Sequence, residues 1–146
     1  MARFLCRLKR RTFSLLPIQL APYCQYTLTA IIGTLLLGLG AHQQGQQGFQ
    51  GAVLAIDPDS LVTPWLVACW LALVLHGLRR AHPVLRRWVG LSGIRTALRP
   101  WEEISDYFLC LDWTSPGHHF MEVLHRYSRT TRQFMFGIPS QQRLRR

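Results

Sequence analysis

The sequence predicts a mainly α-helical protein: a small bundle of about five helices with helix-turn-helix-like order, preceded by an irregular basic arm. Two uncharged apolar stretches, residues 26–41 and 60–78, cover more than one helix face, so each belongs in a protein interior or in a bilayer. Two later stretches, residues 100–111 and 120–136, place apolar side chains at helical spacing. Glycine and proline residues separate these stretches and mark where helices end.

Length and composition indicate how many cores the chain can form and which class of partner its charge favours. The chain has 146 residues, 49% of them hydrophobic, which is enough for one core. We expect an arm over residues 1–25, a helical domain over residues 26–111, and a C-terminal helix with a basic tail over residues 112–146. The net charge of +10 favours nucleic acid or anionic lipid as a partner. The four cysteines form no Cys-x-x-Cys pair, so we expect reduced thiols in a cytoplasmic protein.

The N-terminal arm is strongly basic. Its charged residues are Arg3, Arg7, Lys9, Arg10 and Arg11. A basic start before an apolar run superficially fits a secretory signal, but no small-residue cleavage site follows and two prolines interrupt the run. The charge run alone is also typical of a solvated arm.

A short motif in the arm carries a family resemblance. The run from Arg10 to Pro17, RRTFSLLP, follows Cys6 and resembles the closing half of the zinc ribbon that opens many bacterial transposase-like proteins. The resemblance continues more weakly to about Leu111 and implies a helix-turn-helix after the ribbon. Cys6 stands at the third ligand position, but Lys9 occupies the fourth, and no first Cys-x-x-Cys pair precedes it.

Zinc in a structural site needs four ligands, so we expect no zinc in this remnant of a ribbon. Cys24 would need a different geometry to replace a ligand.

The first apolar stretch, residues 26–41, predicts a helix that Thr27 or Thr29 caps. Its apolar residues recur at helical spacing: Ile31, Ile32, Leu35, Leu36 and Leu39. Three glycines in the stretch each cost up to about 1 kcal/mol in a water-exposed helix. Two interpretations stay open: a buried helix of a bundle, or a membrane span that packs closely through glycine.

The next segment predicts a loop and a short helix. Residues 42–51 are rich in glutamine and glycine and uncharged, as loops are, and a short helix follows over residues 49–56. Asp57, Pro58 and Asp59 form a turn before the next helix. This serial order is that of a helix-turn-helix, and also of many bundles that bind nothing.

The long helix is expected to begin near Ser60, with Pro64 in its first turn, and to stop near Ala81 because Pro83 cannot continue it. Its first turns offer Leu61, Val62, Thr63 and Trp65, which are poor readers of base edges. Any contact with DNA is therefore expected to involve mainly phosphates.

The second half of the chain predicts two further helices and a short one. Residues 83–89 form the short helix, with Arg86 and Arg87 outward, and residues 91–99 a linker. Pro100, with two glutamates after it, opens the next helix. Its apolar face consists of Trp101, Ile104, Phe108 and Leu111.

The last helix runs to residue 136, where Gly137 and Pro139 follow. It places Phe120, Val123, Leu124 and Tyr127 on one face and Arg126, Arg129 and Arg132 on another. This basic stripe suits phosphates, but it is more typical of a solvated face. Between the two helices lie residue types that bind metals, in a spacing that matches no common site, so no metal is expected: Cys110, Asp112, His118 and His119.

No catalytic constellation emerges, because the carboxylates lack the wide-spaced acidic triad of a two-metal nuclease. The prediction is a non-catalytic, transposase-related protein of a mobile element that needs no cofactor and binds duplex DNA. The residues expected to contact DNA are Arg3, Arg7, Lys9, Arg10, Arg11, Arg79, Arg80, Arg86 and Arg87.

A membrane interpretation competes with this one. Residues 26–41 and 61–78 are apolar, the segment between them has no lysine or arginine, and basic residues flank the pair. This pattern fits a two-span hairpin in the inner membrane with both termini cytoplasmic. Trp65 and Trp70 discriminate, since a bundle has to cover them and a membrane protein leaves them facing lipid.

Overall fold

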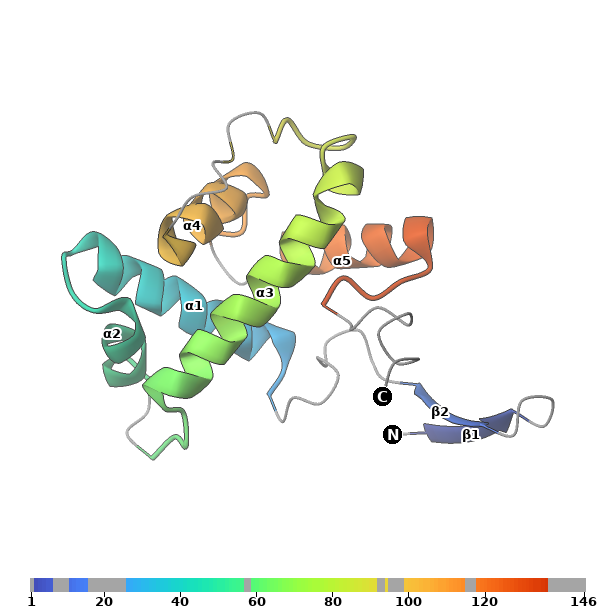
Figure 1. The fold of residues 1–146 in the computed structure, drawn as a ribbon, viewed down its shortest axis with the longest axis horizontal. Coiled ribbons are helices and arrows are strands. Elements are labelled where there is room, and N and C mark those ends of the chain that lie inside the picture. Colours follow the sequence, from blue (N-terminus) through green and yellow to red (C-terminus); the bar gives the residue numbers. More distant parts are fainter. Residues whose placement is uncertain are drawn as a thin grey trace.

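The computed structural model describes residues 2–6, 11–15, 26–56, 59–91, 94, 99–114 and 118–136, the first two ranges by their backbone only. Five helices make up most of this part, which confirms the predicted mainly α-helical class (Figure 1). They are α1 (Leu28–Gln43), α2 (Gly48–Leu54), α3 (Pro64–Leu85), α4 (Pro100–Cys110) and α5 (His118–Thr131).

The longest helix, α3, is the centre of the bundle. It contacts α1, α2, α4 and α5. Figure 1 shows α1 and α2 beside its N-terminal part and α5 beside its C-terminal part. One hydrophobic cluster runs through all of these contacts, and its largest fully buried side chains are those of Trp113, Tyr107, Phe108, Phe120, Leu28, Ile31, Ile32, Leu35, Leu78, Leu85, Ile104 and Leu111.

The N-terminal arm contains regular structure, so the prediction of an irregular arm is wrong for the residues that the structure describes there. Strands β1 (Ala2–Cys6) and β2 (Arg11–Leu15) pair antiparallel, with Cys6 opposite Arg11 and Ala2 opposite Leu15. Phenylalanine and threonine in these segments favour extended backbone, and pairing satisfies the backbone hydrogen-bonding groups of both strands. Arg7, Lys9, Arg10 and Cys24 lie outside the described residues.

Helix α1 begins as predicted. Thr27 has extended backbone, and its hydroxyl accepts a hydrogen bond from the Ala30 N–H at 3.2 Å. The glycines of α1 differ in their surroundings. A methyl group at Gly38 would lie 2.6 Å from Cη2 of Trp101, whereas one at Gly33 would meet no atom within 4 Å. Gly38 therefore permits close packing inside the bundle.

Helix α3 begins three to four residues later than predicted. Thr63 caps it, since its hydroxyl accepts from the Leu66 N–H at 3.2 Å, and Pro64 occupies the first turn. Ser60 caps only a local turn, by accepting from the Val62 N–H at 3.3 Å. The expected start near Ser60 is wrong because Thr63, three residues later, is also a cap residue and directly precedes Pro64.

The expected end of α3 near Ala81 is also wrong. The helix continues through Pro83 to Leu85, and a turn follows in which the Trp88 N–H donates to the Leu85 carbonyl at 2.9 Å. Pro83 is exposed, so the hydrogen bond that it cannot make falls on the solvent side, where water can hydrate the free carbonyl of Arg79. The predicted separate helix over residues 83–89 is thus the end of α3 and a turn.

Helix α4 follows the prediction closely. Pro100 lies in its first turn, and all four predicted core residues of this helix are buried. It ends in a Schellman motif with Asp112 in left-handed conformation (φ 55°). The Trp113 N–H donates to the Phe108 carbonyl at 2.8 Å, and the Trp113 ring packs 5.9 Å from the Phe108 ring.

Helix α5 buries the four apolar residues predicted for it. It ends at Thr131, five residues before the predicted end, because Arg132 adopts a left-handed conformation (φ 54°). The chain then turns back, and Met135 and Phe136 are buried beside Gly77 of α3. A helix continued to residue 136 would not bring Phe136 back to α3.

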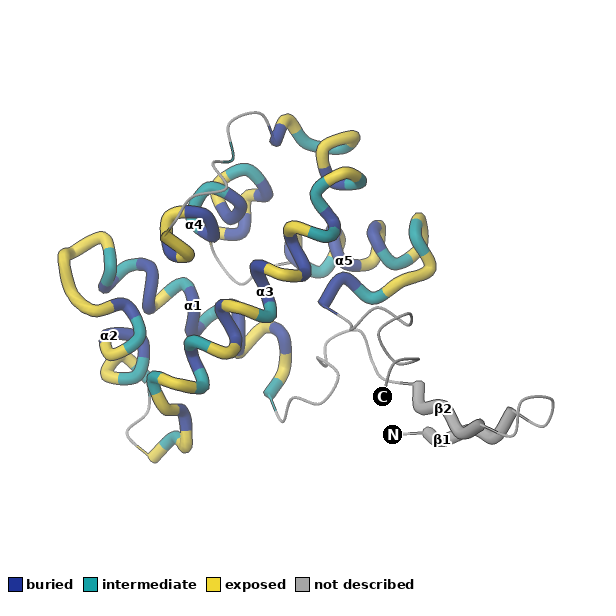
Figure 2. Tube along the Cα trace, in the orientation of Figure 1, coloured by how far each residue is buried: buried dark blue, intermediate teal, exposed yellow. Residues whose placement is uncertain are grey.

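The two tryptophans that discriminate between the interpretations differ from each other. Trp70 is 3% exposed and packs edge-on against Tyr26, whereas Trp65 is 74% exposed. Figure 2 shows this alternation of buried and exposed residues along α3. None of the helices in the described ranges is both long enough and apolar enough to cross a membrane.

Candidate nucleic-acid interface

The arginines predicted to bind DNA have different roles in the structure, and Arg79 makes an internal ion pair. Its Nε donates to Oε1 of Glu103 at 2.7 Å, and its Nη2 donates to Oε2 of the same carboxylate. The Glu103 side chain is fully buried, while that of Arg79 is 53% exposed. The hydrogen bond to Glu103 raises the pKa of Arg79, so this guanidinium is always charged. Its charge is therefore compensated within the bundle.

A second polar contact borders this ion pair. The hydroxyl of Tyr107 lies 3.0 Å from Nδ1 of His82, and the two rings meet edge-on. Burial, and secondarily the carboxylate of Glu103, raises the pKa of Tyr107. The group formed by Arg79, Glu103, Tyr107 and His82 thus joins α3 to α4.

Arg80 also serves the fold. Its Nη2 donates to the carbonyl oxygens of Phe134 and Met135, both at 2.7 Å. These carbonyls belong to the segment that returns to α3 after α5. Arg80 therefore fastens the C-terminal segment of the described chain to the central helix.

Arg86 and Arg87 have the exposed positions that the sequence predicts. They follow the last residue of α3, and both are exposed. The next residue, Trp88, is half-buried and packs against the core. The guanidinium carbon of Arg126 lies over its ring, 4.6 Å from the centroid. This contact places Arg126 of α5 beside the segment that contains Arg86 and Arg87.

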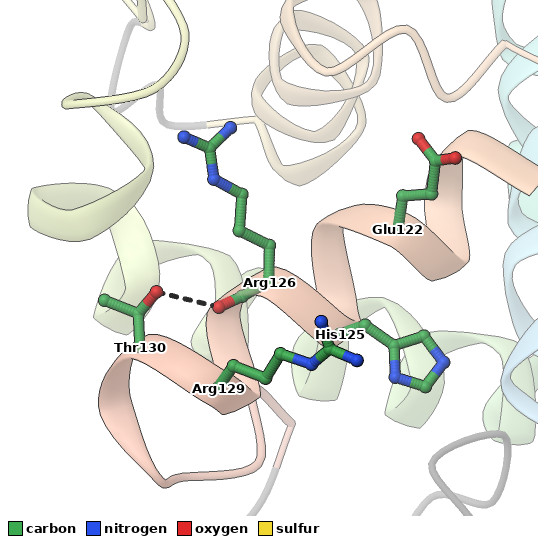
Figure 3. A pocket seen from close by; sticks show the side chains of 5 residues that line it. All are labelled: Glu122, His125, Arg126, Arg129 and Thr130. Atoms are coloured by element: carbon green, nitrogen blue, oxygen red, sulfur yellow. Dashed lines mark hydrogen bonds between the residues drawn. The ribbon is translucent and has the colours of Figure 1, made fainter.

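The outer face of α5 is hollowed. An open hollow of about 540 Å³ is lined by Glu122, His125, Arg126, Arg129 and Thr130. Figure 3 shows Arg129 extended along the helix toward His125, while Arg126 points away from them. The Thr130 hydroxyl donates to the Arg126 carbonyl at 2.9 Å, so this hydroxyl is held against the helix.

The electrostatics of this face favour anions. Within the described ranges, no carboxylate forms an ion pair with the exposed arginines of the two elements, which are Arg86, Arg87, Arg126, Arg129 and Arg132. The nearest acid along α5, Glu122, pairs with His119 at 3.5 Å. We call the surface formed by these five arginines and Trp88 the basic face. It can bind phosphates by charge and offer an aromatic and planar cationic surface for stacking.

The structure does not unite all predicted DNA-binding residues. Arg86 and Arg87 lie on the basic face, and Arg79 and Arg80 have internal partners. Arg3 and Arg11 belong to the hairpin, where only the backbone is described. The arginines of α5 were visible as a stripe, but nothing in the sequence joins Arg126 to Trp88.

The described residues contain no group of three metal-binding side chains close enough to hold an ion. Cys69 and Cys110 are free thiols, the first exposed and the second half-buried. Asp112 completes the end of α4, and His119 pairs with Glu122. Of the residues considered for a metal, Asp112 and His119 therefore have local structural roles, and Cys110 is a free thiol.

Comparison of the chain with protein families, curated proteins and solved structures finds no match.

Proposed function

We propose that this protein is a non-catalytic, transposase-related DNA-binding protein of the cytoplasm that contacts the phosphate backbone through its basic face and its N-terminal arm. The observation that carries the proposal is the position of Arg126 over Trp88, because it brings an arginine of α5 beside the segment that contains Arg86 and Arg87. The relation to transposase-like proteins is supported by RRTFSLLP alone, whose residues Arg11–Leu15 form the second strand of the hairpin.

The binding would be electrostatic and weakly selective for sequence. Arginine binds phosphate through paired N–H donors and keeps its charge at every physiological pH. The first turn of α3 offers Trp65 and Leu66 in place of groups that read base edges. A protein that neutralises phosphates displaces counterions, so its affinity falls steeply as salt rises.

The proposal is tested by anisotropy of a short labelled duplex across a salt series. Each phosphate contact contributes roughly 0.9 to the slope of log affinity against log salt. The triple variant Arg86→Gln, Arg87→Gln, Arg129→Gln should lower the slope by about 2 to 3. Arg99→Gln is the matched control, because Arg99 is an exposed arginine beside Glu102 on α4, and it should leave the slope unchanged.

The arm is tested separately. Reversing the charges of Arg7, Arg10 and Arg11 together should abolish retention on duplex DNA at low salt. A protein that binds no duplex at low salt would refute the proposed function. A loss in Arg99→Gln of about one third of that in the triple variant would show that only net charge matters, since one charge is removed against three, and would remove the basic face from the proposal.

A further inference from the structure

In the contact between Arg126 and Trp88 the guanidinium lies over an aromatic ring, and binding of phosphate by charge does not require such an arrangement. The ring of Trp88 is held by the core, and the guanidinium of Arg126 lies across it at 4.6 Å. Arg126 is exposed and, among the described residues, has no carboxylate partner. The guanidinium of Arg126 therefore lies over the tryptophan ring in an exposed position where a ligand can reach it.

A planar cation fixed in this way is a surface for stacking. Nucleobases stack on aromatic rings and on guanidinium planes, and such stacking tolerates any base because each base has a π-face. In an intact duplex, neighbouring bases cover these faces. Only an unpaired base, in a single strand or at an opened end, can present one.

The surroundings suit the remainder of a nucleotide. Arg87 is adjacent in sequence to Trp88, Arg129 lies one helical turn beyond Arg126, and both side chains are exposed. The outer face of α5 beside Arg126 is an open hollow of about 540 Å³, also lined by Glu122 and His125. A nucleotide whose base stacks on Arg126 would thus have exposed arginines nearby for its phosphates.

We infer that the stack of Arg126 on Trp88 binds an unpaired nucleobase, so that the basic face recognises single-stranded nucleic acid in addition to the duplex phosphates. This inference rests on the proposed function, since the same arginines supply the phosphate contacts. It specifies the ligand as a single-stranded segment whose base stacks on Arg126 while Arg87 and Arg129 hold its phosphates.

The test separates charge from stacking. Arg126→Lys keeps the charge and loses the planar stacking surface. Its affinity for a mixed-sequence single-stranded oligonucleotide should fall about tenfold, within the range expected for the loss of one stacked base. Its affinity for the same oligonucleotide annealed to its complement, at the same salt, should not change. Arg99→Lys is the control, because Arg99 is an exposed arginine outside the basic face, and it should leave both affinities unchanged.

The outcomes distinguish this inference from the proposed function. A selective loss of single-strand affinity in Arg126→Lys supports the stacking site. Wild-type affinity of Arg126→Lys for the single strand, in a protein that binds duplex, overturns the stacking site and leaves the proposed function standing. Failure of the unaltered protein to bind either probe overturns both. Far-UV circular dichroism of both lysine variants, matched to that of the unaltered protein, excludes unfolding as the cause of a loss.

Discussion

The ion pair between Arg79 and Glu103 predicts an asymmetric response to mutation. Its two side chains differ in exposure, 53% for Arg79 and 0% for Glu103. Arg79→Met leaves a buried carboxylate without its cation, which costs about 3–5 kcal/mol of the free energy of unfolding. Glu103→Met leaves an arginine that water can reach, so the loss is closer to that of a surface pair, about 0–1 kcal/mol.

The double variant sharpens this prediction. Arg79→Met with Glu103→Met removes both charges and replaces them with apolar side chains of similar length, so most of the stability lost in Arg79→Met should return. The coupling free energy between the two positions follows from the four proteins of the cycle. Because the carboxylate would otherwise stay buried, the coupling should nearly equal the loss in Arg79→Met.

Urea unfolding followed by far-UV circular dichroism measures these differences. With a slope of about 2 kcal/mol per molar urea, Arg79→Met should lower the midpoint by about 1.5–2.5 M. Equal losses in the two single variants would refute the reasoning, because they would show that exposure does not decide the cost. Unchanged stability of Arg79→Met would show that the pair contributes nothing and that Arg79 is available for other contacts.

Three further predictions concern the stability of the bundle. Gly38→Ala should lower the free energy of unfolding by about 1–3 kcal/mol, because its methyl group would lie 2.6 Å from Trp101. Gly33→Ala, with open space around the new methyl group, should raise the free energy of unfolding by up to about 1 kcal/mol. The same urea assay measures both changes. The raised pKa of Tyr107 means that the fold favours the neutral phenol, so stability should be fully present below pH 10.0 and decline as the pH rises above it; Tyr107→Phe should remove this decline in a pH series of urea midpoints. Asp112→Gly should raise the thermal midpoint by relieving up to about 1 kcal/mol of backbone strain at φ 55°, and an unchanged or lower midpoint would contradict this.

Helical spacing predicted the core of this fold well. The faces of α4 and α5 were correct because their apolar residues alternate with charged ones, so only one orientation buries them. The uncharged residues 64–78 of α3 gave no such indication of a buried face. The boundaries of this helix were predicted from cap residues and prolines alone. Three candidates, Asp59, Ser60 and Thr63, compete to cap it, and Pro83 stays in the helix because its ring is exposed.

The candidate site was harder to predict, since its geometry depends on tertiary contacts. Arg79 and Arg80 are adjacent in sequence and look like one basic patch. On a helix, neighbouring residues point in directions about 100° apart, so one meets Glu103 of α4 and the other meets the carbonyls after α5. Neither partner is identifiable from the sequence, because both depend on how the helices pack.

Position in the fold decides which arginines make internal polar contacts and which remain exposed on the basic face. Arg79 and Arg80 lie on the part of α3 that packs against other elements, where Glu103 of α4 and the carbonyls of Phe134 and Met135 accept from them. Arg86 and Arg87 follow the end of α3, and the arginines of α5 lie opposite a face that the core fixes inward. The contact of Arg126 with Trp88 then connects α5 to the segment that follows α3. A nucleic acid that touches both elements would bind only the docked form, so binding would stabilise the packing of α5 on α3.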